Sequence, residues 1–228
     1  MQTIVKHHMP KAKKATAALG SPAPLPLGPV DPLVRERTRF SPDRTHRFTL
    51  FRHWGDVEDY ACGISMNPSG ATEEDGDQTV DGMCDRARNY WGVGAYYQLN
   101  VMSIRGTYSN QLGTAQTLSL PENDKWIREI APKARFVVVS WGRKGHKTGR
   151  GPEIEKILRE VCDPEKVFCF AKNKDGSPTH PLYISRNAPL IPFSHNIDIF
   201  KWSALVDVQE NDTGIPSQVT LNVELSLA

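Results

Sequence analysis

The chain has 228 residues, enough for one domain with terminal appendages and a substantial hydrophobic core. Its apolar content of 39% and charged content of 24% are ordinary for a globular protein, and no apolar run is long enough to span a bilayer. The formal net charge of +2 is too small to indicate a nucleic-acid partner by itself, so any basic surface has to arise from uneven charge placement.

The first 44 residues are predicted to form a disordered, basic and Pro-rich arm. Four lysines precede the first acidic residue, Asp31, and residues 21–32 read SPAPLPLGPVDP, which favours an extended, polyproline-like linker. The segment is Lys-rich rather than Arg-rich and has no apolar centre, which disfavours a transit peptide. Such an arm can attract phosphate, although solvated tails of this kind usually have no measurable role.

Residues 45–193 are predicted to form an α/β core domain. Four apolar runs each end on a polar or Gly-rich cluster, with helical patterns between them; they are residues 60–69, 95–107, 134–145 and 166–184. This alternation predicts a three-layer α/β/α sandwich with a mostly parallel central sheet, and residues 46–55 fit an edge strand that pairs with the first run. Ligands bind at the carboxyl ends of such strands, so the residues that follow the runs are the candidates for a site.

The first run ends on Asn67-Pro68-Ser69, and Pro68 forces the chain to turn at the end of the strand. Asn67 and Ser69 are therefore candidate site residues, the alternative being an ordinary Asn-Pro turn. The acidic loop that follows contains Asp75 and Asp77, and Asp77 or Thr79 is expected to cap the next helix.

The second run contains Asn100 and Arg105. Asn100 is either a ligand contact or a hydrogen-bonded core residue, and Arg105 is either an anion contact or a solvated loop residue. Asn123 and Asp124 lie at the start of a helix predicted over residues 120–131, where capping alone explains both. We keep them as supporting candidates.

The third and fourth runs lead into a basic segment and a His-Pro loop. Trp141-Gly142-Arg143-Lys144 opens the Gly-rich stretch 143–151, whose charges are all basic and which could cradle phosphates, although it resembles no Walker motif. His180 precedes Pro181 at the same expected sheet edge. It can titrate near neutrality, although a lone histidine is more often structural.

The last segment, residues 194–228, is predicted to be a β extension that packs on the core or on a partner. Its two alternating runs could pair as a hairpin that extends the sheet or form a small partner-binding appendage, and the second run could also be a dimerisation strand. The four cysteines are scattered without metal-ligand spacing. They predict a reducing cytoplasm with no disulfides and no structural zinc, and we expect no metal or cofactor. The acidic loop 73–77 could hold Mg²⁺ loosely, but its carboxylates alone are a weak signal.

Several motifs in order give the chain a family resemblance. From about residue 46 to 192 it resembles the bacterial family known as domain of unknown function 1643. The motifs are MNPS at 66–69, DQTVDGMC at 77–84, GVGAYYQLNV at 92–101, PEND at 121–124, SWGRKG at 140–145 and DGSPTHPLYI at 175–184. After Ser69 the family usually has Thr-Ala-Asp, whereas this chain has Gly-Ala-Thr-Glu, so the acid is displaced to Glu74, Asp75 or Asp77. This resemblance does not imply a particular activity for the chain.

In its expected topology the chain is also similar to the uracil-DNA glycosylase superfamily. That resemblance implies that Asp75 or Asp77, with Asn67 orienting, activates water, and that His180 stabilises the oxygen of the departing base. Trp141 would stack on a base, and Arg143, Lys144, Lys147 and Arg150 would grip the backbone of the nucleic acid.

The leading hypothesis is therefore a cytoplasmic enzyme, N-glycosidase-like, that processes a nucleobase or nucleotide in nucleic acid. A non-catalytic nucleotide or nucleic-acid binding module is the second hypothesis, and an interaction protein without a small-molecule site is the third. No membrane partner is expected, and an oligomer could form through the C-terminal strands.

Overall fold

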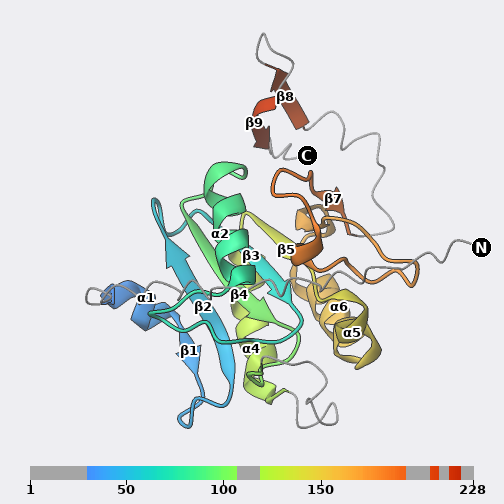
Figure 1. The fold of residues 1–228 in the computed structure, drawn as a ribbon. Helices are drawn as coiled ribbons and strands as arrows, with labels where there is room; N and C mark the ends of the chain where they lie inside the picture. Colours follow the sequence, from blue (N-terminus) through green and yellow to red (C-terminus); the bar gives the residue numbers. More distant parts are fainter. Residues whose placement is uncertain (1–29, 107–118, 194–205, 211–215, 222–228) are drawn as a thin grey trace, which may run out of the picture.

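The computed structural model describes residues 30–106, 119–193, 206–210 and 216–221, and it has a mixed α/β fold (Figure 1). The strands are β1 (Arg39–Phe40), β2 (Arg47–His53), β3 (Tyr60–Ser65), β4 (Ala95–Asn100), β5 (Phe136–Val139), β6 (Val167–Cys169), β7 (Ile191–Pro192), β8 (Val206–Glu210) and β9 (Pro216–Leu221). The α-helices are α1 (Pro32–Arg37), α2 (Gln78–Asn89), α4 (Pro121–Ile130), α5 (Gly142–Lys147) and α6 (Arg150–Val161).

Seven strands form the main sheet, in the order β1-β2-β4-β3-β5-β6-β7. The four central strands, β4, β3, β5 and β6, run parallel, whereas β1, β2 and β7 join the sheet antiparallel. The prediction of a mostly parallel sheet is therefore wrong, because half of the neighbouring pairs are antiparallel and the sheet is mixed.

The pairing of β2 also differs from the prediction. Residues 46–55 were expected to form an edge strand beside the first apolar run, but β2 lies between β1 and β4. Both sides of β3 are occupied by parallel neighbours, β4 and β5, so β4 offers the remaining open side. Alternation along one strand indicates which face is buried and does not indicate which strand lies beside it.

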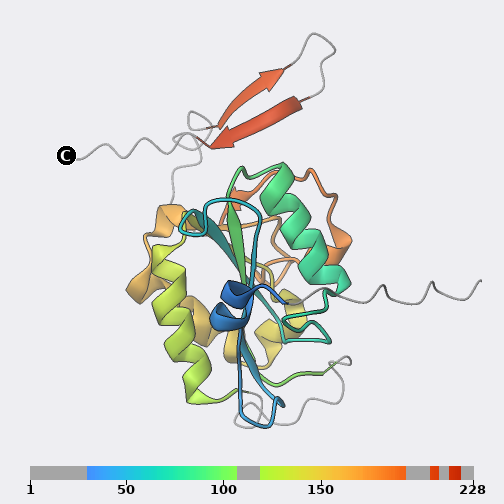
Figure 2. The same ribbon diagram turned by 90° about the vertical axis from the view of Figure 1, so that its left-hand side faces the viewer.

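The central strands are apolar because both faces of the sheet are covered. All six residues of β3 and all six of β4 are buried. One hydrophobic cluster joins Cys62 and Ile64 to Ile127 of α4 and Ile154 of α6, while a second joins Ala61 to Met83 of α2. Figure 2 shows α2 and α4 on opposite sides of the sheet. The amphipathic helices therefore lie on both faces and leave the strand ends as the places where polar side chains gather.

Folded structure begins earlier than residue 45. Asp31 caps α1 by accepting a hydrogen bond from the Leu33 backbone N–H at 2.8 Å, and Val34 is buried in the first cluster. Short β1 then pairs with β2. The predicted arm therefore reaches at most to about residue 30, because a capped turn with one buried apolar side chain anchors the segment. Residues 1–29 lie outside the described residues.

The C-terminal strands β8 and β9 pair antiparallel as a separate two-stranded sheet, so they do not extend the seven-stranded one. The two runs therefore pair with each other, but the expected extension of the main sheet does not form. Their role as a partner or dimerisation surface stays a prediction. Within the described part of the chain, every helix is too short or too polar to cross a bilayer.

Candidate functional site

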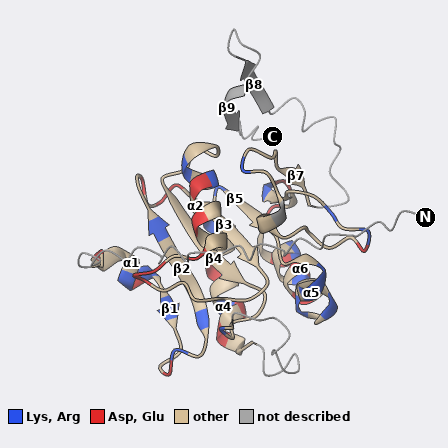
Figure 3. Ribbon diagram, in the orientation of Figure 1, with Lys and Arg blue, Asp and Glu red and all other residues tan. Residues whose placement is uncertain are grey.

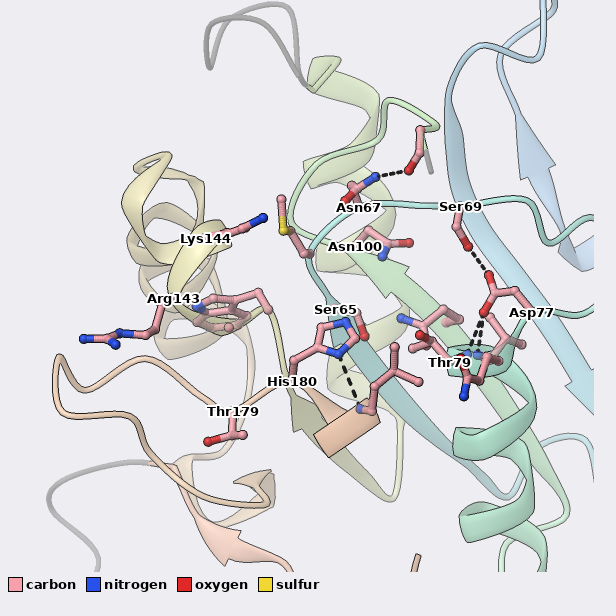
Figure 4. A pocket seen from close by; sticks show the side chains of 18 of the residues that line it. Ser65, Asn67, Ser69, Asp77, Thr79, Asn100, Arg143, Lys144, Thr179 and His180 are labelled. Atoms are coloured by element: carbon pink, nitrogen blue, oxygen red, sulfur yellow. Dashed lines mark hydrogen bonds between the residues drawn. The ribbon is translucent and has the colours of Figure 1, made fainter. Parts of the chain in front are cut away.

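A cavity of about 680 Å³ opens at the carboxyl ends of the parallel strands (Figure 4). The segments that follow β3, β5 and β6 line it, together with the ends of β2 and β4 and the start of α2. Its polar walls carry one carboxylate, one imidazole, five side-chain amides and several hydroxyls. These residues are Asp77, His180, Asn67, Gln78, Gln98, Asn100, Asn173, Ser65, Ser69, Thr79 and Thr179. The walls can make directional contacts to a small polar ligand.

The cavity brings together nine of the thirteen residues that the sequence suggested. They are Asn67, Ser69, Asp77, Asn100, Trp141, Gly142, Arg143, Lys144 and His180. The other four, Asp75, Arg105, Asn123 and Asp124, do not line it. Strand ends that are distant in sequence meet at this edge, as expected for parallel strands.

Asp77 is held in a single orientation at the start of α2. Its Oδ1 accepts hydrogen bonds from the backbone N–H groups of Thr79 at 2.9 Å and Val80 at 2.8 Å, and its Oδ2 accepts one from the Ser69 hydroxyl. A carboxylate has about four acceptor positions, so one on Oδ2 is left for a water or a ligand. Asp77 is therefore both a helix cap and a fixed acceptor in the cavity wall.

The amide of Asn67 is oriented by the turn that follows β3. Its Nδ2 donates to the carbonyls of Pro68 at 3.1 Å and Gly106 at 2.9 Å. Because both donor hydrogens are used, the oxygen Oδ1 is the group that remains for a ligand. Asn67 thus ties two loops together and contributes an acceptor.

His180 lies across the cavity from the cap of α2 (Figure 4). Its Nδ1 accepts a hydrogen bond from the Leu182 backbone N–H at 3.4 Å, so in the neutral ring the proton is on Nε2. Burial lowers the pKa of His180 from its usual 6.5, and the negative charge of Asp77 opposes this only in part. The ring is therefore neutral at pH 7 and presents an N–H donor.

Gly142 couples the loop of His180 to the end of β5. Its φ of +67° is a left-handed conformation that favours glycine, and its backbone N–H donates to the carbonyl of Pro178 at 2.9 Å. A Cβ at this position would lie 3.6 Å from the Cβ of His180. The glycine therefore sets how the histidine loop packs on the start of α5.

The stability of the protein is expected to fall as the pH drops below about 6.5. Burial lowers the pKa values of both His180 and His46, so the unfolded chain binds more protons than the folded protein. Their contribution is fully present above 6.5 and is lost as the pH falls through the lowered values. Urea unfolding between about pH 7.5 and about pH 5.5 measures this slope. His180→Gln should flatten it, and an unchanged slope would contradict the assignment.

The segment that follows β5 differs from the prediction in two ways. Residues 142–147 form helix α5 rather than a Gly-rich loop. Trp141 is only 1% exposed and packs edge-on against Phe193, with ring centroids 5.6 Å apart. It cannot act as an exposed platform for base stacking, because its faces are already covered. It forms part of the cavity wall.

Arg143 and Lys144 are exposed and line the cavity at the start of α5 (Figure 4), and Figure 3 shows Lys and Arg positions of this helix in blue. The Arg143 Nε donates to Asp175 at 3.2 Å, and Asp175 also accepts from the backbone and hydroxyl of Ser177. These hydrogen bonds lower the pKa of Asp175 to about 2, with the Ser177 hydroxyl as the largest cause. The two cations lie at the rim and not among the buried polar groups.

Asp75 and Arg105 belong to the loop that surrounds the site and do not reach the cavity. Asp75 is exposed, and its carbonyl, rather than its carboxylate, accepts from Thr72 and Arg52. Arg105 donates to the carbonyls of Arg44 and Gly70, both at 3.2 Å, and its guanidinium lies over the ring of Phe40. Arg105 therefore connects two loops outside the cavity, and its role as an anion contact stays a prediction.

Asn123 and Asp124 support the end of β4 from α4. The Asn123 Nδ2 donates to the carbonyl of Asn100 at 2.9 Å. Asp124 forms an ion pair with Arg150, whose Nε donates to the carbonyl of Val101 at 3.1 Å. Arg150 is 8% exposed and is occupied by these contacts, so the prediction that it grips a nucleic-acid backbone is wrong.

Sequence reasoning missed Arg47, which lines the cavity from β2 and is 2% exposed. It also missed Ser65 and Gln98, which lie inside buried strands, and Asn173 and Thr179, which lie after β6. The signal for Arg47 was a charged residue directly before the largely apolar stretch 48–51, since a buried arginine needs specific partners. Nothing in the sequence indicated that β2 borders β4.

No group of three or more potential metal-ligating side chains occurs among the described residues.

The comparison with known families gives a match of residues 47–182 to the family described as Protein of unknown function (DUF1643). Neither a curated protein nor a solved structure matches the chain.

Proposed function

The chain belongs to the DUF1643 family, and we propose that it hydrolyses the N-glycosidic bond of a nucleobase compound, in nucleic acid or as a nucleotide. The observation that carries the proposal is that the side chains of Asp77 and His180 line the same cavity. A fixed carboxylate acceptor and a neutral imidazole donor line the same cavity, together with amide side chains. These are the groups that glycosidic cleavage of a base requires.

The arrangement of the loops supports the same proposal by analogy. A polar loop follows β3, a glycine follows β5 and a His-Pro loop follows β6, which is the pattern that we liken to the uracil-DNA glycosylase superfamily. We propose that the helices on the two sheet faces form the three layers of such a fold. The exposed cations Arg143 and Lys144 at the rim suit a phosphate-bearing substrate.

The proposed reaction uses water as the nucleophile. The Oδ2 of Asp77 and the Oδ1 of Asn67 accept hydrogen bonds from the water, and the carboxylate also stabilises the positive charge that develops on the sugar. The water oxygen bonds to C1′ of the sugar, and its proton passes to Asp77. The electron pair of the C1′–N bond leaves with the base, whose oxygen accepts a hydrogen bond from the Nε2–H of His180. Solvent then protonates the base.

A binding module without turnover is the second candidate, and one observation favours it. Asp77 already caps α2, which is a sufficient structural reason for a carboxylate at this position. Binding without a released base would support this second candidate.

The proposal is tested by incubating the purified full-length protein with single- and double-stranded DNA carrying modified bases and with free nucleotides. Released base is detected by mass spectrometry. His180→Ala is expected to lower the rate about 10²-fold or more, because the donor to the departing base is lost. His53→Ala is the control, since His53 pairs with Asp31 outside the cavity at 2.9 Å. Equal loss in both variants, or no released base from any substrate, would contradict the enzymatic proposal.

A further inference from the structure

Arg47 is a buried cation whose charge is not neutralised by a direct ion pair. It is 2% exposed, and the ion pairs among the described residues do not include it. Its Nη1 donates to the carbonyl of Ala71 at 2.9 Å and its Nη2 donates to Oδ1 of Asn100 at 3.3 Å. Its Nε has no hydrogen-bond partner within the described ranges. A buried charge held in this way is costly, so it requires an explanation beyond packing.

The contact with Arg47 determines which way the Asn100 amide faces. A guanidinium carries only donors, so the oxygen of the amide must face it and the nitrogen must face away. Asn100 lines the cavity, and Figure 4 shows its side chain facing the same space as Ser65 and His180. The Nδ2 of Asn100 is thus offered to a ligand as a donor.

The backbone of Asn100 is fixed as well. Asn123 donates to its carbonyl, and the Arg150 side chain donates to the carbonyl of the following residue, Val101. Because the strand end cannot shift easily, a ligand cannot obtain the opposite polarity by moving Asn100. Reversing the amide would place its NH₂ group against the guanidinium, donor against donor, in a buried site.

We infer that Arg47 is a positioning residue that fixes the Asn100 amide, so that the cavity selects a ligand carrying an oxo group over one carrying an amino group at the same place. The inference rests on the proposed function for the class of ligand, a nucleobase compound. It goes beyond that function by naming the residue that sets the polarity of the site and the ligand group that this polarity accepts.

The ligand test compares two pairs that differ chiefly by an oxo or an amino group. Uridine and cytidine 5′-monophosphate form one pair, and inosine and adenosine 5′-monophosphate form the other, with affinities measured by calorimetry on the full chain. The wild type should prefer the oxo member of at least one pair about tenfold, because an amino group would meet the Asn100 donor. Equal affinity for both members of each pair would overturn the inference while leaving the proposed function standing.

Two variants separate orientation from packing. Arg47→Met should reduce the preference to about twofold, since nothing then prevents the amide from reversing. Asn100→Asp keeps an acceptor toward Arg47 and presents a second oxygen to the cavity, so the preference should reverse in favour of the amino member. The control is Arg52→Met, because Arg52 also ties β2 to the loop through the carbonyls of Thr72 and Asp75 but has no contact with Asn100. Loss of preference in the control to the same extent would contradict the role of Arg47.

A readout without any ligand keeps the inference testable if no nucleotide binds. The side-chain amide signals of Asn100 are identified in a ¹⁵N NMR spectrum by their disappearance in Asn100→Asp. They should shift in Arg47→Met and stay in place in Arg52→Met, provided that all variants give folded spectra. Unshifted signals in Arg47→Met would overturn the inference whatever the ligand is. Shifted signals without nucleotide binding would support the orientation and count against the proposed substrate class alone.

Discussion

Asp77→Asn is expected to lower the rate of base release by about 10²–10⁴-fold while the fold stays intact. The amide oxygen of Asn can still accept the backbone N–H groups of Thr79 and Val80, and Asn is as good a helix cap as Asp. The variant loses the negative charge and the acceptor on Oδ2, which are the features that the proposed reaction uses. Stability should therefore change by about 1 kcal/mol or less.

The matched control is Asp75→Asn, which removes a carboxylate from the same loop. Asp75 is exposed and does not line the cavity, so its substitution should leave the rate within about twofold of wild type. Rates come from mass spectrometry of the released base, and stability comes from urea unfolding. Full activity in Asp77→Asn would show that this carboxylate serves only as a cap.

The second large effect concerns stability at the centre of the sheet. Gly63→Ala is expected to destabilise the protein by about 3 kcal/mol or more, because a Cβ on Gly63 would lie 1.9 Å from the hydroxyl oxygen of Tyr96. Tyr96 is 1% exposed and donates to Oε1 of Gln98 at 2.8 Å. Moving the ring would therefore break a buried hydrogen bond as well as strain the core.

The expected measurement is a lower melting temperature, by about 6–12 °C for a chain of this size. Gly70→Ala is the control, because nothing lies within 4 Å of a Cβ at that exposed position. It should change stability by about 0.5 kcal/mol or less. Equal melting temperatures for the two variants would show that the Tyr96 ring can move at little cost.

The sequence predicted the parts of the site that depend on local signals. Asn67-Pro68 requires a turn whatever surrounds it, and Asp77 followed by an amphipathic run predicts a capped helix, which the structure has as α2. The strand runs of β3 and β4 were equally clear because both faces are buried. These signals are short-range, and they placed Asn67, Asp77 and His180 at one sheet edge.

What could not be predicted depends on contacts between distant segments. The position of β2 beside β4 brings Arg47 to Asn100, and no local pattern carries that information. The basic segment after Trp141 reads as a loop because of its glycines, yet Gly145 and Gly151 pack against the Trp141 side chain within helices α5 and α6. Close packing, rather than backbone freedom, explains those two glycines.

The cavity walls run from Arg47 to Leu182, and the family match covers residues 47–182. The segment that defines family membership is therefore the smallest continuous stretch that encloses the pocket. Helix α1 and strand β1, which precede it, contribute no wall. A fragment trimmed inside these limits at either end would lose a residue of the cavity wall, Arg47 at one end or Leu182 at the other.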